Sequence, residues 1–149
     1  MARSVERTVA DHIPAPPDEV RAHYVDLTNL AVVHPLITSV VVIGETAEGD
    51  GYRRTYRIKD LVPVGFLKLP IAYTAVMQVP ARGPVTSQAF QFPGIRLQSR
   101  VSFDPAGAGT QLTEVIRISA PRPLLGLTVR RAVAAHSEML ADLRWHFSG

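Results

Sequence analysis

The chain has 149 residues, 46% of them hydrophobic and 19% charged, which predicts one globular domain over residues 1–149 that needs no metal or disulfide to fold. Its lack of cysteine excludes disulfides, zinc–thiolate sites, iron–sulfur clusters and cysteine nucleophiles. The net charge is +3, and the 16 basic residues, all but two of them arginine, are scattered along the sequence. Nucleic-acid-binding domains concentrate basic residues on one stripe, so this pattern argues against a nucleic-acid partner.

The sequence also bears on location. No apolar run approaches the roughly 20 residues that a membrane-spanning helix needs. The first residues lack the apolar core of a signal peptide. We therefore expect a cytoplasmic protein with no membrane span, and either a monomer or a homodimer.

The first part of the chain predicts one strand and two short helices. The strand covers residues 5–13 and ends at a run of prolines within residues 14–17. Two acidic residues follow, which favours the first turn of a helix that ends near Asp26. A second helical turn is expected over residues 29–33, before Pro35.

The middle of the chain predicts six strands joined by short turns. Val, Ile and aromatic residues alternate there with polar ones, between segments rich in Gly, Pro and Asp. The strands cover residues 38–45, 52–60, 71–79, 85–92, 95–103 and 110–120. Residues 61–70 are apolar but contain Pro63, Gly65 and Pro70, which discourage regular pairing, so we expect a loop there. A further loop is expected over residues 104–109.

Residues 124–147 predict one long helix, about 36 Å at 1.5 Å per residue. Its apolar residues recur every three or four positions and form one stripe, opposite a side that carries Arg131, Glu138, Asp142 and Trp145. The stripe consists of Leu125, Val129, Ala132, Val133, His136, Met139, Leu140, Leu143 and Phe147.

The order of these elements predicts an α+β fold. Consecutive strands with short connections must pair antiparallel, and a sheet with one apolar face needs a cover. Only the C-terminal helix is long enough to provide it. We therefore expect a curled seven-stranded antiparallel sheet that grips one long C-terminal helix, with two short helices after the first strand.

Four segments carry a resemblance to a known family. Residues 12–20 (HIPAPPDEV) show a strand end, a proline step and a helix start, and residues 26–30 (DLTNL) precede His34-Pro35, where the family often has Trp-x-Pro. Residues 109–114 (GTQLTE) open the last strand, and the closing helix follows. In this order the chain resembles the START-like helix-grip superfamily (SRPBCC), which includes polyketide cyclases and lipid-transfer proteins. Here His34 stands where an aromatic is common, without the spacer before Pro35.

The resemblance implies a cavity between sheet and helix for an apolar or amphipathic small molecule, with no cofactor. From the inward faces we expect a lining that is mainly apolar with a few polar groups. The expected lining residues are Tyr24, His34, Arg54, Tyr56, Tyr73, Met77, Leu97, Glu114, Ile116, Val129, Val133, His136 and Leu140. The resemblance also suggests that residues 61–70 gate the cavity mouth through Pro63, Gly65, Phe66 and Leu67, beside residues 91–94. A strand extension or an oligomer contact are the alternatives for that segment.

Glu114 and His136 are the candidate chemical groups. Period two places Glu114 on the apolar face of the last strand, and period 3.6 places His136 in the helix stripe. A buried charge must be paired, linked to water or protonated, so Glu114 is either a cavity acid or base or part of a structural ion pair. His136 either contacts a ligand or is a core histidine. We find no third residue to orient the two and no nucleophile, which favours ligand recognition over catalysis.

Arg54 is the third candidate group. It could pair with Glu114, hold an acidic ligand group, or lie at the sheet rim with its charge in water. We expect His23 to be exposed, and His12 and His146 show no partner in the sequence. The five histidines show no metal-binding spacing, so no metal site is expected.

Three functions remain open from the sequence. The first is binding or transport of an apolar or amphipathic molecule of the lipid, polyketide or isoprenoid type. The second is a cofactor-free polyketide cyclase or dehydratase that uses cavity acid–base residues. The third is an interaction protein similar to toxin-like or ribosome-associated members of the superfamily. Fold alone does not choose among them.

Overall fold

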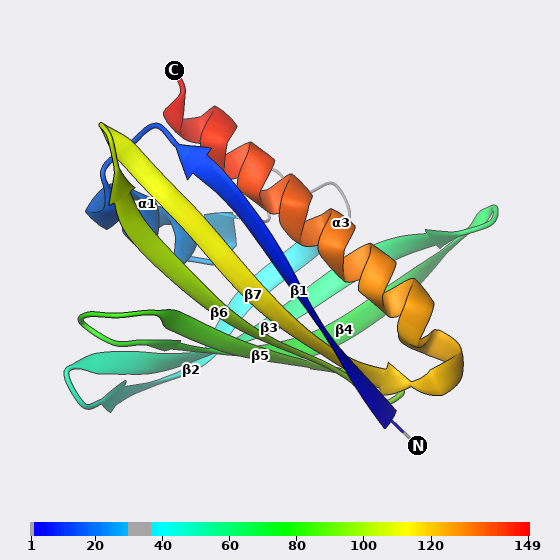
Figure 1. Ribbon diagram of the computed structural model, residues 1–149. Helices are drawn as coiled ribbons and strands as arrows, with labels where there is room; N and C mark the ends of the chain where they lie inside the picture. Colours follow the sequence, from blue (N-terminus) through cyan, green and yellow to red (C-terminus); the bar gives the residue numbers. More distant parts are fainter. Residues whose placement is uncertain (1, 30–36) are drawn as a thin grey trace.

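The long helix α3 (Arg122–Phe147) lies across one face of a curved antiparallel sheet, with the short helix α1 (Pro17–Tyr24) near its C-terminal end (Figure 1). The computed structural model describes residues 2–29 and 37–149. Within these ranges, seven strands are ordered β1-β7-β6-β5-β4-β3-β2 across the sheet. They are β1 (Ala2–Ile13), β2 (Ile37–Glu48), β3 (Gly51–Val64), β4 (Leu67–Val79), β5 (Val85–Gln91), β6 (Ile95–Ala106) and β7 (Gly109–Pro121). The predicted α+β fold is confirmed.

The segment over residues 61–70 is a strand pair, so the prediction of a loop there was wrong. Leu61 pairs with Pro70 and Pro63 with Lys68, and a two-residue turn that begins at Gly65 joins β3 to β4. Gly65 has φ +62°, which a glycine adopts without strain. The prolines are tolerated because pairing of β3 with β2 and of β4 with β5 stops short of this tip. Among the described residues, each strand therefore has a side without a pairing partner, where a missing N–H costs nothing.

The predicted loop over residues 104–109 is also shorter than expected. β6 and β7 pair as far as Ala106 and Gly109, which leaves a two-residue turn between them. Gly107 in this turn has φ +60°, so it again supplies the left-handed backbone that reverses the chain. Long pairings at both ends of the sheet give strands of 12 to 14 residues, apart from β5.

The hydrophobic core lies between the concave face of the sheet and the two helices. Alternate residues of β7 are fully buried on this face, and α3 packs mainly against β1 and β7. The helix contributes Ala132, Leu140 and Leu143 to the core, all members of the predicted stripe. The opposite side of α3 is exposed at Arg131 and Glu138, as its polar residues require.

Two expectations concern residues outside the described ranges. Residues 30–33 of the predicted second helical turn lie there, and so does His34. Among the helices of the described residues, none is long and apolar enough to cross a membrane.

Candidate functional site

The carboxyl group of Glu114 contacts two side chains from other elements, Tyr24 and His136. We call these three residues the trio. Glu114 lies in the middle of β7 with its side chain 0% exposed. The hydroxyl of Tyr24, at the end of α1, donates to Oε2 at 2.9 Å. Nδ1 of His136, in the middle of α3, lies 2.6 Å from Oε1. Each carboxyl oxygen therefore has a hydrogen-bonding partner, which is what burial of a carboxylate requires.

Tyr24 holds its proton firmly in this arrangement. Burial raises the pKa of the Tyr24 phenol well above 10, and the adjacent Glu114 raises it further because a phenolate would face a carboxylate. The neutral hydroxyl is thus a dependable donor to Oε2. Tyr24 also packs edge-on against Phe103, with ring centroids 5.5 Å apart, which fixes the direction of its hydroxyl.

His136 is the member of the trio that reaches solvent. Its side chain is 23% exposed, whereas Glu114 is sealed. An ionised carboxylate only accepts hydrogen bonds, so Nδ1–H is the donor to it, and in the neutral imidazole this leaves Nε2 as the acceptor nitrogen. None of the described residues forms a hydrogen bond with Nε2. The trio therefore presents one oriented imidazole nitrogen, backed by a buried carboxylate.

Arg54 does not join this group. Its guanidinium lies 2.6 Å from Glu45 on the neighbouring strand, directly opposite it in the β2–β3 register, and donates to the hydroxyl of Tyr56 at 3.1 Å. The suggested pairing with Glu114 is wrong, because Glu45 satisfies Arg54 at the rim. Tyr56 is fully buried and donates to the carbonyl of Val25 at 3.0 Å, so it fastens the end of α1 to the sheet.

The other expected lining residues fall into two groups. Met77, Ile116 and Leu140 are fully packed in the core. A second group faces the same interior but is only partly buried, although it packs against the core: Tyr73, Leu97, Val129 and Val133. Burial, and then the charge of Asp60, raise the pKa of Tyr73, so this phenol too is neutral. Two members of the partly buried group lie on α3 (Val129 and Val133) and two lie on the sheet, Tyr73 on β4 and Leu97 on β6.

Two polar features of the site were not predicted from the sequence. Tyr24 was expected only as a lining residue, yet it is the third partner that Glu114 and His136 need. The hydroxyls of Ser87 and Ser99 lie 2.5 Å apart on the concave face, and Ser99 is buried. The alternation of side chains along a strand places both serines on the inward face, and this pattern could have identified them. The position of Tyr24 depends on how α1 docks and has no local signal.

The tip of the β3–β4 hairpin, which contains the suggested gate residues, extends beyond the rest of the sheet. Phe66 at its turn is 96% exposed, and Leu67 beside it is also exposed. Pro63 pairs with Lys68 just before the turn. Closure of this tip over a ligand stays a prediction.

The other histidines among the described residues have structural partners. His23 stacks on His146 with ring centroids 4.1 Å apart, and Phe147 meets the same ring edge-on. Nε2 of His12 lies 3.1 Å from the carbonyl oxygen of Ala106. His23 is therefore half-buried, not exposed as expected. The described residues contain no cluster of histidine and carboxylate side chains that could hold a metal ion.

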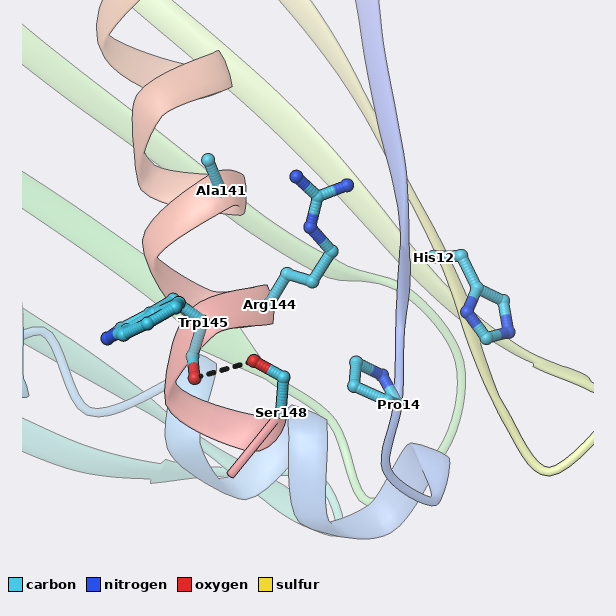
Figure 2. Close-up of a pocket in the computed structure, with 6 residues that line it drawn as sticks. All are labelled: His12, Pro14, Ala141, Arg144, Trp145 and Ser148. Atoms are coloured by element: carbon cyan, nitrogen blue, oxygen red, sulfur yellow. Dashed lines mark hydrogen bonds between the residues drawn. The ribbon is translucent and has the colours of Figure 1, made fainter.

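A separate hollow of about 320 Å³ lies on the outer surface, between the C-terminal end of α3 and β1 (Figure 2). Arg144, Trp145 and Ser148 line one side of it, and His12 and Pro14 the other. Neither Glu114 nor His136 belongs to it. It is open to solvent and lined by a salt-bridged arginine, Arg144 with Asp11, so we do not assign the chemistry of the trio to it.

Comparison with known proteins agrees with the fold. A family model described as polyketide cyclase / dehydrase and lipid transport matches residues 2–145. Among curated protein sequences, no significant match is found. The family match covers well over half of the chain.

Three solved structures show the same fold. TTHA0849 from Thermus thermophilus has a TM-score of 0.66 and 22% identity, covering 93% of this chain and 91% of its own. The Zhui aromatase/cyclase from Streptomyces sp. R1128 has a TM-score of 0.65 and 20% identity, covering 96% and 94%. A START superfamily protein from Mycobacterium smegmatis has a TM-score of 0.69 and 16% identity, covering 97% and 96%. At these identities the likeness establishes the fold alone.

Proposed function

Because the chain belongs to the polyketide cyclase / dehydrase and lipid transport family, we propose that it binds an apolar or amphipathic small molecule between α3 and the concave face of the sheet. The polar end of this molecule hydrogen-bonds to Nε2 of His136. Its apolar part contacts the partly buried side chains around Val129, Val133 and Leu97. Lipids, polyketides and isoprenoids have this combination of one polar end and a large apolar surface.

The observation that carries this proposal is the contrast in exposure between Glu114 and His136. The carboxylate is sealed, but the imidazole that it orients is 23% exposed. A histidine needed only for packing has no reason to be held by a buried carboxylate, since leucine would fill the space without a desolvation cost. A binding site needs this arrangement, because an oriented polar group at the edge of an apolar surface fixes how the ligand sits.

The apolar contribution comes from partly buried side chains of α3 and of the sheet. Val129 and Val133 lie one turn apart on the helix, and Tyr73 and Leu97 lie on the sheet. Removing apolar surface from water contributes about 25 cal/mol per Å². A ligand that covers these side chains therefore gains binding energy that the protein alone does not use. The polar groups toward the interior are few, namely the trio and the Ser87–Ser99 pair, and they favour a ligand with a localised polar end.

The same trio supports acid–base catalysis as a second candidate function. Glu114 orients the imidazole and would stabilise the imidazolium after His136 takes a proton at Nε2, as a carboxylate does for a general base. Tyr24 keeps the carboxylate in place. On a polyketide, such a base would remove a proton from carbon next to a carbonyl, the step that begins cyclisation. This proposal differs from simple binding only in requiring turnover.

Binding is tested by blocking the proposed space with tryptophan. The probe is a dansyl-labelled fatty acid, and its affinity is measured for wild type, Leu97→Trp and Val133→Trp. Ala134→Trp is the control, because Ala134 is exposed on the same helix next to Val133. We expect Leu97→Trp and Val133→Trp to bind the probe about tenfold or more weakly than wild type, and Ala134→Trp to bind it with unchanged affinity. Equal affinity in all four proteins would refute the site.

Catalysis is tested on a linear poly-β-ketone with wild type and Glu114→Gln. Loss of turnover with the dansyl fatty acid still bound would support an enzyme. No turnover by the wild type would leave binding as the function. Circular dichroism of the variant provides the folding control.

A further inference from the structure

Exposed apolar side chains gather at one end of the molecule. This end, which we call the hairpin end, comprises the β3–β4 tip, the β5–β6 turn and the first turns of α3, all on the right in Figure 1. Phe66 is 96% and Phe92 91% exposed, each within or beside a tight turn. Leu67, Leu69 and Leu127 are also exposed there. Large apolar side chains exposed at the tips of turns indicate a contact surface.

Two of the three elements lie close together, and the strand register places the third beyond them. The β5–β6 turn approaches the start of α3, because a Cβ on Gly94 would lie 3.7 Å from Cγ of Pro121. The β3–β4 hairpin extends past the end of β5, since the last pairing between β4 and β5 joins Thr74 to Phe90. The strand register therefore places the hairpin tip as the outermost part of this end.

The charge of the hairpin end has a single sign. Residues 61–71, 90–97 and 120–131 contain no aspartate or glutamate. The same three segments contain Lys68, Arg96, Arg122, Arg130 and Arg131. None of these five forms an ion pair with any described residue. No side chain caps the N-terminus of α3, whose free N–H groups add to the positive potential.

Carboxylates are concentrated elsewhere. Glu48 and Asp50 lie at the β2–β3 turn, and Asp18 and Glu19 at the start of α1. Figure 1 shows both places at the left, opposite the hairpin end. The five basic residues of the hairpin end therefore lie away from these carboxylates, which net charge alone does not reveal.

We propose that the hairpin end docks on the surface of an anionic lipid bilayer, with Phe66 and Phe92 entering the interface and the five cations facing lipid phosphates. Aromatic side chains at tips insert among acyl chains while Lys and Arg remain at the headgroups. An acidic protein would satisfy the cations but would need hollows for two separated phenylalanines. A bilayer accepts them wherever they lie in one plane. This interaction does not depend on the ligand that the interior binds.

The proposal fixes an orientation, which Trp145 can report. Trp145 is the single tryptophan, is 81% exposed, and lies near the end of α3 far from the hairpin end. Docking through the hairpin end keeps it in water. Docking through any surface near the α3 C-terminus would bury it. The native fluorescence of the protein therefore separates the two orientations.

The experiment measures co-sedimentation with phosphatidylcholine vesicles that contain or lack phosphatidylglycerol, at low and high salt. We expect binding only to the anionic vesicles and weakening by salt. Phe66→Ser/Phe92→Ser should weaken binding about tenfold or more, and each of Lys68→Gln and Arg122→Gln about fivefold. Trp145→Ser is the matched control, an exposed aromatic at the other end, and should bind like wild type. Because Phe66 and Phe92 are exposed, their loss leaves the fold intact, which circular dichroism checks.

The orientation is measured by tryptophan emission. We expect no shift of wild-type Trp145 on vesicle addition, and a blue shift for Phe66→Trp in a Trp145→Phe background. A blue shift of Trp145, or anionic vesicles not bound at low salt, would overturn the proposal. Equal binding to soluble polyglutamate, insensitive to the phenylalanine pair, would overturn it in favour of an acidic protein. Val133→Trp should retain vesicle binding, so this test succeeds or fails independently of the interior ligand.

Discussion

Tyr24→Phe removes one oxygen atom and tests whether the buried trio stabilises the fold. The ring remains to pack against Phe103. Only the donor to Oε2 of Glu114, at 2.9 Å, is lost. Because Glu114 is 0% exposed, water does not replace the missing hydroxyl without local opening.

The magnitude follows from the kind of hydrogen bond. Bonds to charged groups contribute about 1.5–3 kcal/mol, and a buried acceptor left without its donor costs about 1–3 kcal/mol. We expect the free energy of unfolding to fall by about 2 kcal/mol. For a domain of this size that corresponds to a decrease in Tm of roughly 4–8 °C. The other oxygen of Glu114 keeps His136, so the fold survives.

Urea unfolding of wild type, Tyr24→Phe and Tyr52→Phe gives the measurement. Tyr52 is partly exposed, so losing its hydroxyl should change stability by less than about 0.5 kcal/mol. If Tyr24→Phe is no more destabilised than Tyr52→Phe, the hydrogen bond to Glu114 does not hold the site, and the reasoning fails. An equal m value in all three proteins shows that they expose the same surface on unfolding, so that their free energies of unfolding can be compared.

Other predictions concern pH and backbone space. Burial, followed by the charge of His146, lowers the pKa of His23 below its usual 6.5, so the folded state binds fewer protons than the unfolded one below about that pH. Stability should therefore decline between about pH 7 and about pH 5, and His23→Phe should flatten the decline; an unchanged slope would contradict this. Gly51→Ala should destabilise by about 1–3 kcal/mol, because its Cβ would lie 2.6 Å from Cα of Pro80. Gly126→Ala should instead stabilise α3 by about 0.5–1 kcal/mol in thermal melts, because a Cβ at this position would have no atom of another segment within 4 Å. A Gly126→Ala protein less stable than Gly51→Ala would refute the packing argument.

Periodicity predicted the fold and two of the three residues in the trio. Glu114 shares its strand face with Leu112 and Ile116, both fully buried, and His136 shares its stripe with Leu140. These local patterns are reliable because each face is defined within one element. That the carboxylate and imidazole meet follows from α3 packing on β7, which the order of elements already required.

What the sequence could not supply depends on contacts between distant segments. Tyr24 and Glu114 are separated by 90 positions, and their bond depends on how α1 docks. Arg54 could not be assigned without the β2–β3 register, which sets it opposite Glu45. Pro63 and Pro70 indicated a loop because proline disfavours central strands, but among the described residues neither strand has a second partner at that point. In each case the missing information was which distant segment lies beside the residue, and local sequence patterns do not contain it.

The central claim is that the interior beside His136 binds an apolar or amphipathic molecule, and NMR during titration with the dansyl-labelled fatty acid tests it most directly. Labelled valine methyls and histidine rings report on the interior through Val129, Val133 and His136. Trp145 and His12 report on the outer hollow. We predict saturable shifts at Val129, Val133 and His136, with Trp145 and His12 unchanged. Shifts confined to Trp145 and His12, or no saturable shift at all, would contradict the account.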